Sequence, residues 1–559
     1  MFPDDTTTAF PYALWVADVR LPLSNPVSDK APRSARRRLW WGAGSLLAAA
    51  GLFALYLRQA LTTPGDSDGA ANALQAWDML HGNLLLHGWW LGDATYYTTE
   101  LPEYVLVEAV RGLNPDVVRI CSALTYTLLV LLAALLARGR TQGREGVVAA
   151  LLAAGVMLSP GILLGTGVLL GVPDHVGTGV PVLLILLLLD RAEEWKRRWP
   201  VPLALGLMLT WVQVADPLAT YAAAVPVVLV CGGRAGVALT RRRRGSGDLA
   251  QANRRGDRLR AGSYDLALTA AAAVSVPVAH ALLAAIYSAG GFYAYPIGIG
   301  GPLLGRLAAV PTHALVTGES VLVLFGANFF GQPSRIGAAL AVLHLAGVAV
   351  AALGLLAGVR VFFSRLDRVG QILVTGTIVI LAAGVFSARL PNLTFAHEIA
   401  IVLPFGAVLA GRLLAAPLIR HGLQPALAVV LAAYLGALCY AAAGAPVPAK
   451  GQAAADWLVA HHLTYGVAGY WQAAIITLDT SGRVTVAPLY PGTTAAYYWE
   501  SDGAWFDPRL HYADFVLTVG SPDGIFRSFG PAARTYHYQQ YTIMVWHQNL
   551  LASLAPGRA

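Results

Sequence analysis

Apolar runs of about 20 residues, separated by short polar stretches, dominate the chain as far as residue 445. A helix needs about 20 apolar residues to cross the hydrocarbon core of a bilayer. The pattern therefore predicts a mainly α fold, a polytopic transmembrane helix bundle of about 11 spans. The predicted spans are residues 39–60, 117–138, 147–170, 176–190, 199–215, 217–233, 264–288, 336–358, 371–388, 398–418 and 424–444.

The pattern changes after residue 445, where a Pro/Ala/Gly-rich linker ends the apolar runs. A short helix from Ala453 to His462 is predicted next, followed by strand-like runs separated by Gly-, Pro- and Asp-rich turn signals. These runs are Ala473 to Thr477, Val484 to Pro488, Ala513 to Val519 and Tyr541 to Val545. Residues 446–559 are therefore expected to form a small soluble α/β domain.

Two connections between the predicted spans are long. Residues 61–116 are rich in Trp, Tyr and acidic residues, and the periodicity from Ala70 to Leu86 suits a helix lying on the membrane surface. Residues 289–335 are rich in Gly and aromatic residues and predict a lid or re-entrant region. The polar residues 1–38 predict a disordered tail ahead of a retained first span.

Charge sets the expected orientation. Only 13% of the 559 residues are charged, against about 25% in soluble proteins. The net charge of +8 comes from arginines in alternate connections, the topogenic pattern of cytoplasmic loops and not a nucleic-acid surface. Eleven spans then place the N-terminus in the cytoplasm and the C-terminal domain outside it. The expected location is a bacterial plasma membrane.

Ionisable groups cluster in the connections predicted to lie on the outer side, in greater number than solubility requires. Asp66 and Asp68 have a simpler explanation as helix caps, and Asp216 as a turn residue before Pro217. Arg389 follows a span on the side where arginine is disfavoured, which indicates an anionic partner. The full set is Asp66, Asp68, Asp78, Asp93, Glu100, Glu103, Asp174, His175, Asp216, Arg389, His397 and Glu398.

Three segments of the first long connection carry a family resemblance: Asp68-Gly69, Met79-Leu80-His81-Gly82 and Tyr97 to Pro102. Together they resemble the first outer loop of the GT-C membrane glycosyltransferases, most closely the protein O-mannosyltransferase and aminoarabinose transferase branches. Gly69 stands where the family usually has a second acid, and Glu100 stands near the family's lysine. The large first loop, the late arginine and the soluble C-terminal domain agree with this architecture.

The resemblance implies an inverting transfer of a sugar from a polyprenyl-phosphate carrier to a cell-envelope glycan, lipid or protein. It gives Asp68 the role of general base and Arg389 that of phosphate contact. The other implied substrate-binding residues are His175, Asp174, His397, Glu398, Asp93, Glu100 and Tyr97. A divalent cation, Mg²⁺ or Mn²⁺, is compatible with these groups, although no tight ligand motif identifies a metal.

Two alternatives to an enzyme remain. A lipid-linked glycan transporter or flippase should carry charges deep within several spans, whereas the charges here collect near span ends. An inactive relative that scaffolds an envelope-synthesis complex is the second, because Gly69 replaces an acid. In the C-terminal domain, Tyr470-Trp471, Trp499 and Trp505 are candidates for stacking on an acceptor glycan, with interfacial anchoring the alternative for Tyr470-Trp471.

Overall fold

The structure is a computed structural model that describes residues 30–243, 249–296, 304–388, 392–520 and 524–558. Met1–Gly51 and Leu52–Ala559 form separate compact units. In the described residues, ten helices are long and apolar enough to cross a membrane. Helix α1 (Lys30–Ala60) runs from the first unit into the second. The long helices of the bundle in the second unit are α4 (Asp116–Arg138), α5 (Gly143–Met157), α8 (Gly179–Ala192), α9 (Pro200–Ala215), α10 (Val225–Arg243), α11 (Leu249–Ser288), α13 (Arg335–Val361), α14 (Arg368–Phe386), α15 (Val402–Arg420) and α16 (Gln424–Ala442).

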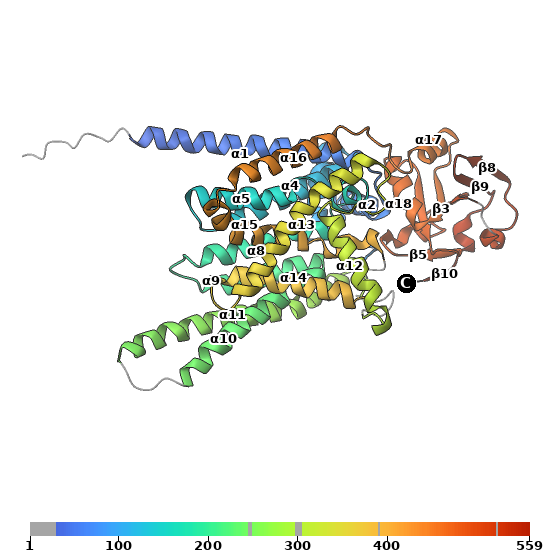
Figure 1. Ribbon diagram of the computed structural model, residues 1–559. Coiled ribbons are helices and arrows are strands. Elements are labelled where there is room, and N and C mark those ends of the chain that lie inside the picture. Colours follow the sequence, from blue (N-terminus) through green and yellow to red (C-terminus); the bar gives the residue numbers. More distant parts are fainter. Residues whose placement is uncertain (1–29, 244–248, 297–303, 389–391, 521–523, 559) are drawn as a thin grey trace, which may run out of the picture. The chain divides into compact units, whose positions relative to one another are not determined.

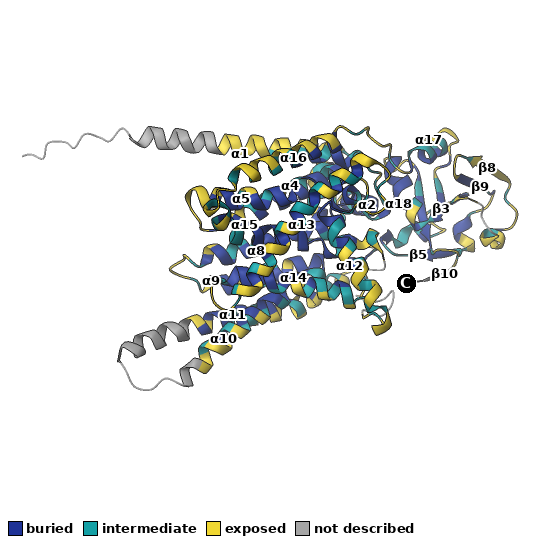
Figure 2. Cartoon of the chain, in the orientation of Figure 1, coloured by how far each residue is buried: buried dark blue, intermediate teal, exposed yellow. Residues whose placement is uncertain are grey.

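The bundle is built to face lipid. Figure 2 shows buried residues along the inner faces of the helices and exposed ones along their outer faces. Many exposed side chains on these helices are large and apolar, which is the surface that hydrocarbon requires. Examples are Leu135, Leu203, Leu229, Leu266, Leu353 and Val429. The chain is therefore a multi-pass membrane protein.

One apolar helix falls in the second long connection, which the sequence predicts as a lid or re-entrant region. This helix is α12 (Val310–Leu324), within residues 289–335. The helix was missed because Pro311, His313 and Glu319 interrupt its apolar run. It starts beside the backbone bridge between Leu304 and Ser387.

The end of α12 packs against the connection that follows α5. Gly326, just after α12, packs on Gly161, and Gly337, in the first turn of α13, packs on Ile162. The end of α12 and the start of α13 thus meet at one corner. The ten candidate spans include α12, whereas α9 is a shorter apolar helix and the α5–α6 pair occupies the span predicted at 147–170.

The span predicted at 147–170 is broken into two helices. After α5 the chain turns at Pro160 and resumes as α6 (Leu164–Leu170). Proline lacks the backbone N–H that a helix needs, which explains the break. A side chain at Gly161 would lie 2.7 Å from the Cα of Gly326, so the break leaves room for the corner between α12 and α13.

The C-terminal domain has a seven-stranded mixed sheet of order β10-β5-β4-β3-β7-β9-β8. Strand β3 lies centrally and pairs parallel with β4 and β7. The helices are α17 (Gln452–Ala460) and α18 (Tyr470–Asp479), and the strands are β3 (Tyr465–Gly469), β4 (Thr485–Leu489), β5 (Ala495–Tyr497), β7 (Phe515–Val519), β8 (Arg534–Tyr538), β9 (Tyr541–Val545) and β10 (Ala555–Arg558).

One predicted strand of this domain, Ala473 to Thr477, is helical, because it belongs to α18. Its residues are apolar on two faces. Ile476 joins the core of the domain, whereas Ile475 and Leu478 pack in the core formed by the first long connection. A helix buried on two sides has no polar stripe, so its short apolar run cannot be told from a buried strand by pattern alone.

The first long connection packs against the C-terminal domain. It contains α2 (Ser67–Leu80) and α3 (Glu100–Arg111), and the first half of α2 is buried against α3 and α18. The predicted surface helix is therefore wrong for this half. The strands β1 (Trp89–Leu91), β2 (Tyr293–Ala294) and β6 (Ser501–Asp502) form a second sheet that joins three distant segments. We call this side of the bundle the domain end (Figure 1).

Candidate active site

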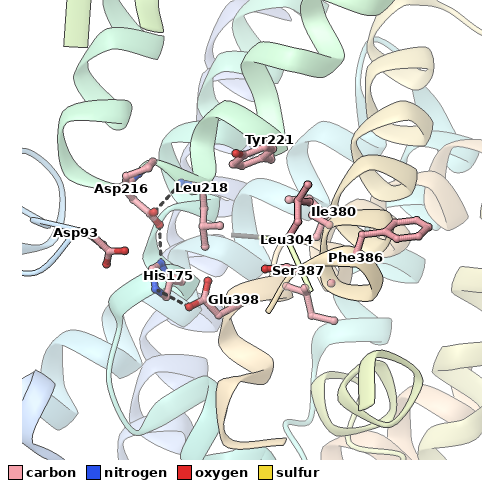
Figure 3. Close-up of a pocket in the computed structure, with 15 residues that line it drawn as sticks. Asp93, His175, Asp216, Leu218, Tyr221, Leu304, Ile380, Phe386, Ser387 and Glu398 are labelled. Carbon is pink, nitrogen blue, oxygen red and sulfur yellow. Dashed lines mark hydrogen bonds and ion pairs between the residues drawn. The ribbon is translucent and has the colours of Figure 1, made fainter. Parts of the chain in front are cut away.

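A cavity of about 210 Å³ lies at the domain end of the bundle. Figure 3 shows polar side chains gathered on one side, namely Asp93, His175, Asp216 and Glu398. Apolar side chains form the other side, among them Leu304, Ile380 and Phe386. The cavity therefore combines an ionisable wall with an apolar wall.

His175 is the centre of the polar wall. Its Nδ1 lies 2.9 Å from Oδ2 of Asp216, and its Nε2 lies 3.8 Å from Oε1 of Glu398. Asp216 also accepts hydrogen bonds from the Thr178 hydroxyl and, at 2.8 Å, from the backbone N–H of Leu218. Three connections of the bundle thus meet at one imidazole.

The local sequence explains why Asp216 points into this cluster. It ends α9 in an extended conformation, which the following proline favours. Burial raises the pKa of Asp216, but the His175 imidazole and the hydrogen-bond donors outweigh it and leave the pKa below its usual range. Asp216 is therefore a buried, ionised partner that fixes the orientation of His175.

His397 stacks on His175, with ring centroids 5.4 Å apart and planes inclined by 12°. Burial and the neighbouring His175 lower the pKa of His397 to about 3, so its imidazole is neutral. His175, His397 and Glu398 each offer one ligand atom, and these atoms lie within 4.8 Å of one another. Among the described residues, this group is the one that could hold a metal ion.

Asp68 lies next to this cavity, not in its wall. Asp68 sits in the first turn of α2. The N-cap of this helix is Asp66, whose Oδ1 accepts a hydrogen bond of 3.0 Å from the backbone N–H of Gly69. Asp68 accepts a hydrogen bond from the Tyr470 hydroxyl. Burial raises the pKa of Asp68, while the Tyr470 hydroxyl and the His175 imidazole oppose this rise. The capping explanation thus applies to Asp66, and Asp68 has a different role.

The other predicted substrate-binding residues of the described part, apart from Asp93, do not line the cavity and instead contact the segments around it. Asp174 accepts a hydrogen bond of 3.0 Å from Asn72, which ties the His175 segment to α2. Glu100 is buried against Gly177, behind the cavity, and burial raises its pKa well above the usual range. Tyr97 donates to the backbone carbonyl of Leu84 at 2.9 Å and packs on Phe292, away from the cavity wall. Arg389 lies outside the described residues.

Asp216 and Glu500, whose Oε2 lies 2.5 Å from the Tyr470 hydroxyl that binds Asp68, had weak signals in the sequence. Asp216 was expected to be a turn residue, but an acid before proline between two apolar runs is also a costly charge near membrane depth. Glu500 ends the aromatic run Tyr497-Tyr498-Trp499, and no local pattern marks it as part of a site formed by the first long connection.

No family model matches the sequence, and no curated protein matches it. A crystal structure of ArnT from Cupriavidus metallidurans, bound to undecaprenyl phosphate, matches with a TM-score of 0.53. The alignment covers 90% of this chain and 98% of that chain at 14% identity. The chain has a GT-C fold. The archaeal oligosaccharyltransferase AglB from Archaeoglobus fulgidus, in complex with an inhibitory peptide and a dolichol-phosphate, gives a TM-score of 0.44 at 14% identity, covering 86% of this chain and 70% of that chain.

This fold confirms the predicted class, a transmembrane helix bundle with a small C-terminal α/β domain. At 14% identity the likeness concerns the fold, and the roles of individual residues need separate arguments.

Proposed function

We propose that this chain is a membrane glycosyltransferase that moves a sugar from a polyprenyl-phosphate carrier to an extracytoplasmic acceptor. One observation carries the proposal: the 210 Å³ cavity has an ionisable wall facing an apolar wall within a GT-C fold. A polyprenyl-phosphate sugar has a polar part, the sugar phosphate, and an apolar part, the isoprenoid chain, which match these two walls. The ArnT structure with this fold was solved with undecaprenyl phosphate bound.

The proposed reaction is a single displacement with inversion at the anomeric carbon. Asp68 acts as general base toward the attacking hydroxyl of the acceptor, a cell-envelope glycan, lipid or protein. Ser387 lines the cavity, and Arg389 follows two residues later, so we assign Arg389 to the leaving phosphate. The polar wall of Asp93, His175 and Glu398 holds the sugar.

A divalent cation fits three residues of this site. His175, His397 and Glu398 would hold it, and the contact of His175 Nδ1 with Asp216 is the usual support for a metal-bound imidazole. Two imidazoles and one carboxylate favour Mn²⁺ or Zn²⁺ over Mg²⁺. When bound, the cation would supply positive charge to the phosphate.

We place the domain end outside the cytoplasm, in a bacterial plasma membrane, with the N-terminus in the cytoplasm. Arginines of the connections 139–142 and 362–367 lie at the opposite end, as the positive-inside rule requires. The C-terminal domain and the cavity then face the compartment where lipid-linked sugars are used. The partners are membrane lipids, the donor and the acceptor.

A flippase is the alternative function, and a direct assay distinguishes it from a glycosyltransferase because a flippase breaks no covalent bond. The assay gives purified protein a radiolabelled polyprenyl-phosphate sugar together with membrane extract as the acceptor source. Transfer moves the label to the acceptor fraction and releases polyprenyl phosphate. Label that stays entirely on the carrier while crossing the bilayer supports the flippase.

Filling the apolar side of the cavity should abolish transfer. Ala383 lines the cavity from α14, so Ala383→Phe is expected to reduce transfer at least tenfold by excluding the donor chain. Ala382 is the matched control: it is the preceding residue of the same helix, is exposed and does not line the cavity. Ala382→Phe should transfer at the wild-type rate. Equal rates for wild type and Ala383→Phe would mean that the donor binds elsewhere.

A further inference from the structure

The Tyr470 hydroxyl lies between two carboxylates that come from opposite ends of the sequence. It is within hydrogen-bond distance of Oδ1 of Asp68, in the first long connection. It is also 2.5 Å from Oε2 of Glu500, in the C-terminal domain. Tyr470 and Glu500 are both largely buried. One phenol oxygen therefore links the proposed base to an acid of the domain.

Proton counting restricts the charge of this arrangement. A tyrosine hydroxyl carries one proton and can donate to one carboxylate only. The second carboxyl must either bring its own proton and donate to the phenol oxygen, or face that oxygen with an uncompensated buried charge, which is costly. The stable arrangement therefore has one proton shared between Asp68 and Glu500 in addition to the tyrosine proton.

The surroundings favour Glu500 as the site of this proton. Burial and the negative charge of Asp68 raise the pKa of Glu500 well above its usual range. The rise at Asp68 is opposed by the Tyr470 hydroxyl and by the His175 imidazole. The other titratable groups that face the two carboxyls are Asp66, Asp174, Tyr96 and Tyr497. The carboxyl groups of Asp66 and Asp174 disfavour a negative charge on Glu500 in addition to the one on Asp68.

The backbone holds Glu500 in place at some cost. Its φ is 51°, in the left-handed region that residues other than glycine seldom adopt. The next residue, Ser501, pairs with Trp90 in the sheet that joins the domain to the first long connection. A side chain at Gly92 would lie 3.0 Å from Oε1 of Glu500, so glycine there leaves room for the carboxyl.

We propose that Tyr470 and a protonated Glu500 are positioning residues that keep Asp68 ionised and oriented for the reaction. This inference rests on the proposed glycosyl transfer. The chain of donors runs from the Glu500 carboxyl to the Tyr470 oxygen and from the Tyr470 hydroxyl to Asp68. The C-terminal domain thus supplies part of the active site.

The proton balance of the step follows. The acceptor hydroxyl loses its proton to the oxygen of Asp68 that does not bind Tyr470, and its oxygen forms the new bond to the anomeric carbon. The bond between that carbon and the phosphate oxygen breaks, and its electron pair leaves with the polyprenyl phosphate. Glu500 keeps its proton throughout, so it accepts none from the substrate.

The test compares pH profiles of kcat/KM for four variants. Tyr470→Phe removes the donor to Asp68, so the pKa of Asp68 rises, the acid limb moves to higher pH, and the rate falls about 10- to 100-fold. Glu500→Gln keeps a neutral donor and should stay within about threefold of wild type. Glu500→Leu should show a weaker form of the Tyr470→Phe effect. Tyr497→Phe is the matched control, because its ring packs on Tyr470 at 5.6 Å.

An unchanged acid limb in Tyr470→Phe, or a Glu500→Gln rate as low as that of Glu500→Leu, would overturn the proposal. Infrared spectra of the purified variants at neutral pH test it without any substrate. The absorption of one protonated carboxyl should be lost in Glu500→Gln and kept in Asp68→Asn, and the opposite pattern would also overturn the inference. Failure of the transfer assay alone contradicts the proposed function but leaves this spectroscopic test intact.

Discussion

Asp68→Asn is expected to lower the rate of sugar transfer by about 10²- to 10⁴-fold, the usual contribution of a positioned general base. Asparagine keeps the size of the side chain and can still bind the Tyr470 hydroxyl through its carbonyl oxygen, but it cannot take a proton at neutral pH. The KM for the donor should change little, because Asp68 does not line the cavity. The measurement is the initial rate of label transfer at saturating donor.

Asp66→Asn is the matched control for this loss. Asp66 lies two residues away in the same acidic group and caps α2 through the backbone N–H of Gly69. Asparagine caps helices as well as aspartate does, so the fold should be kept while the ionisable carboxyl of Asp66 is removed. We expect transfer within a fewfold of wild type. A similar loss in both variants would show that total charge matters here and that Asp68 is not the base.

The spans could be predicted because each needs about 20 apolar residues whatever it packs against. This requirement concerns consecutive residues, so it is visible in the sequence. The predictions differ from the structure where packing against distant segments, and not contact with lipid, determines which residues are apolar. Helix α12 meets the corner of α13 at Gly161 and tolerates polar residues, and α18 is buried on two faces. Neither environment leaves a distinctive local pattern.

The residues of the candidate site also fall into a group that local patterns predict and a group that depends on distant contacts. His175, Glu398 and Asp93 were predictable because charged residues collect in connections on one side of the bundle, and they line one cavity. The partners that set their chemistry were not predictable. Tyr470 is 402 positions from Asp68, and the sequence marks Tyr470 only as an aromatic residue. Their meeting depends on how the C-terminal domain docks on the first long connection.

The arginines at the opposite end of the bundle have a second role beyond topology. Arg368 binds Asp265 at 2.7 Å and also contacts Glu193, and Arg234 lies 3.4 Å from Asp265. These pairs join α10, α11, α14 and the connection after α8. The arginines that we propose to orient the chain in the membrane thus also fix the packing of its helices.

A further buried ion pair at this end joins Asp190 to Arg412, and Asp190→Leu is expected to reduce the free energy of unfolding by about 3–5 kcal/mol. The Asp190 side chain is fully buried, and its Oδ1 lies 2.5 Å from Arg412. Removing the carboxylate leaves a guanidinium that is only 14% exposed, with Asp367 at 3.1 Å as its remaining partner. The measurement is the denaturation midpoint of the protein in detergent.

Two further variants show whether the unpaired charge causes the loss. Arg144→Ala removes an exposed charge at the same end and should leave the midpoint unchanged. The double variant Asp190→Leu, Arg412→Leu removes both buried charges together, and apolar replacement of a buried pair is often neutral. It should therefore be more stable than Asp190→Leu alone. A double variant less stable than the single one would mean that Arg412 stabilises the bundle mainly through Asp367, which still links α15 to the start of α14.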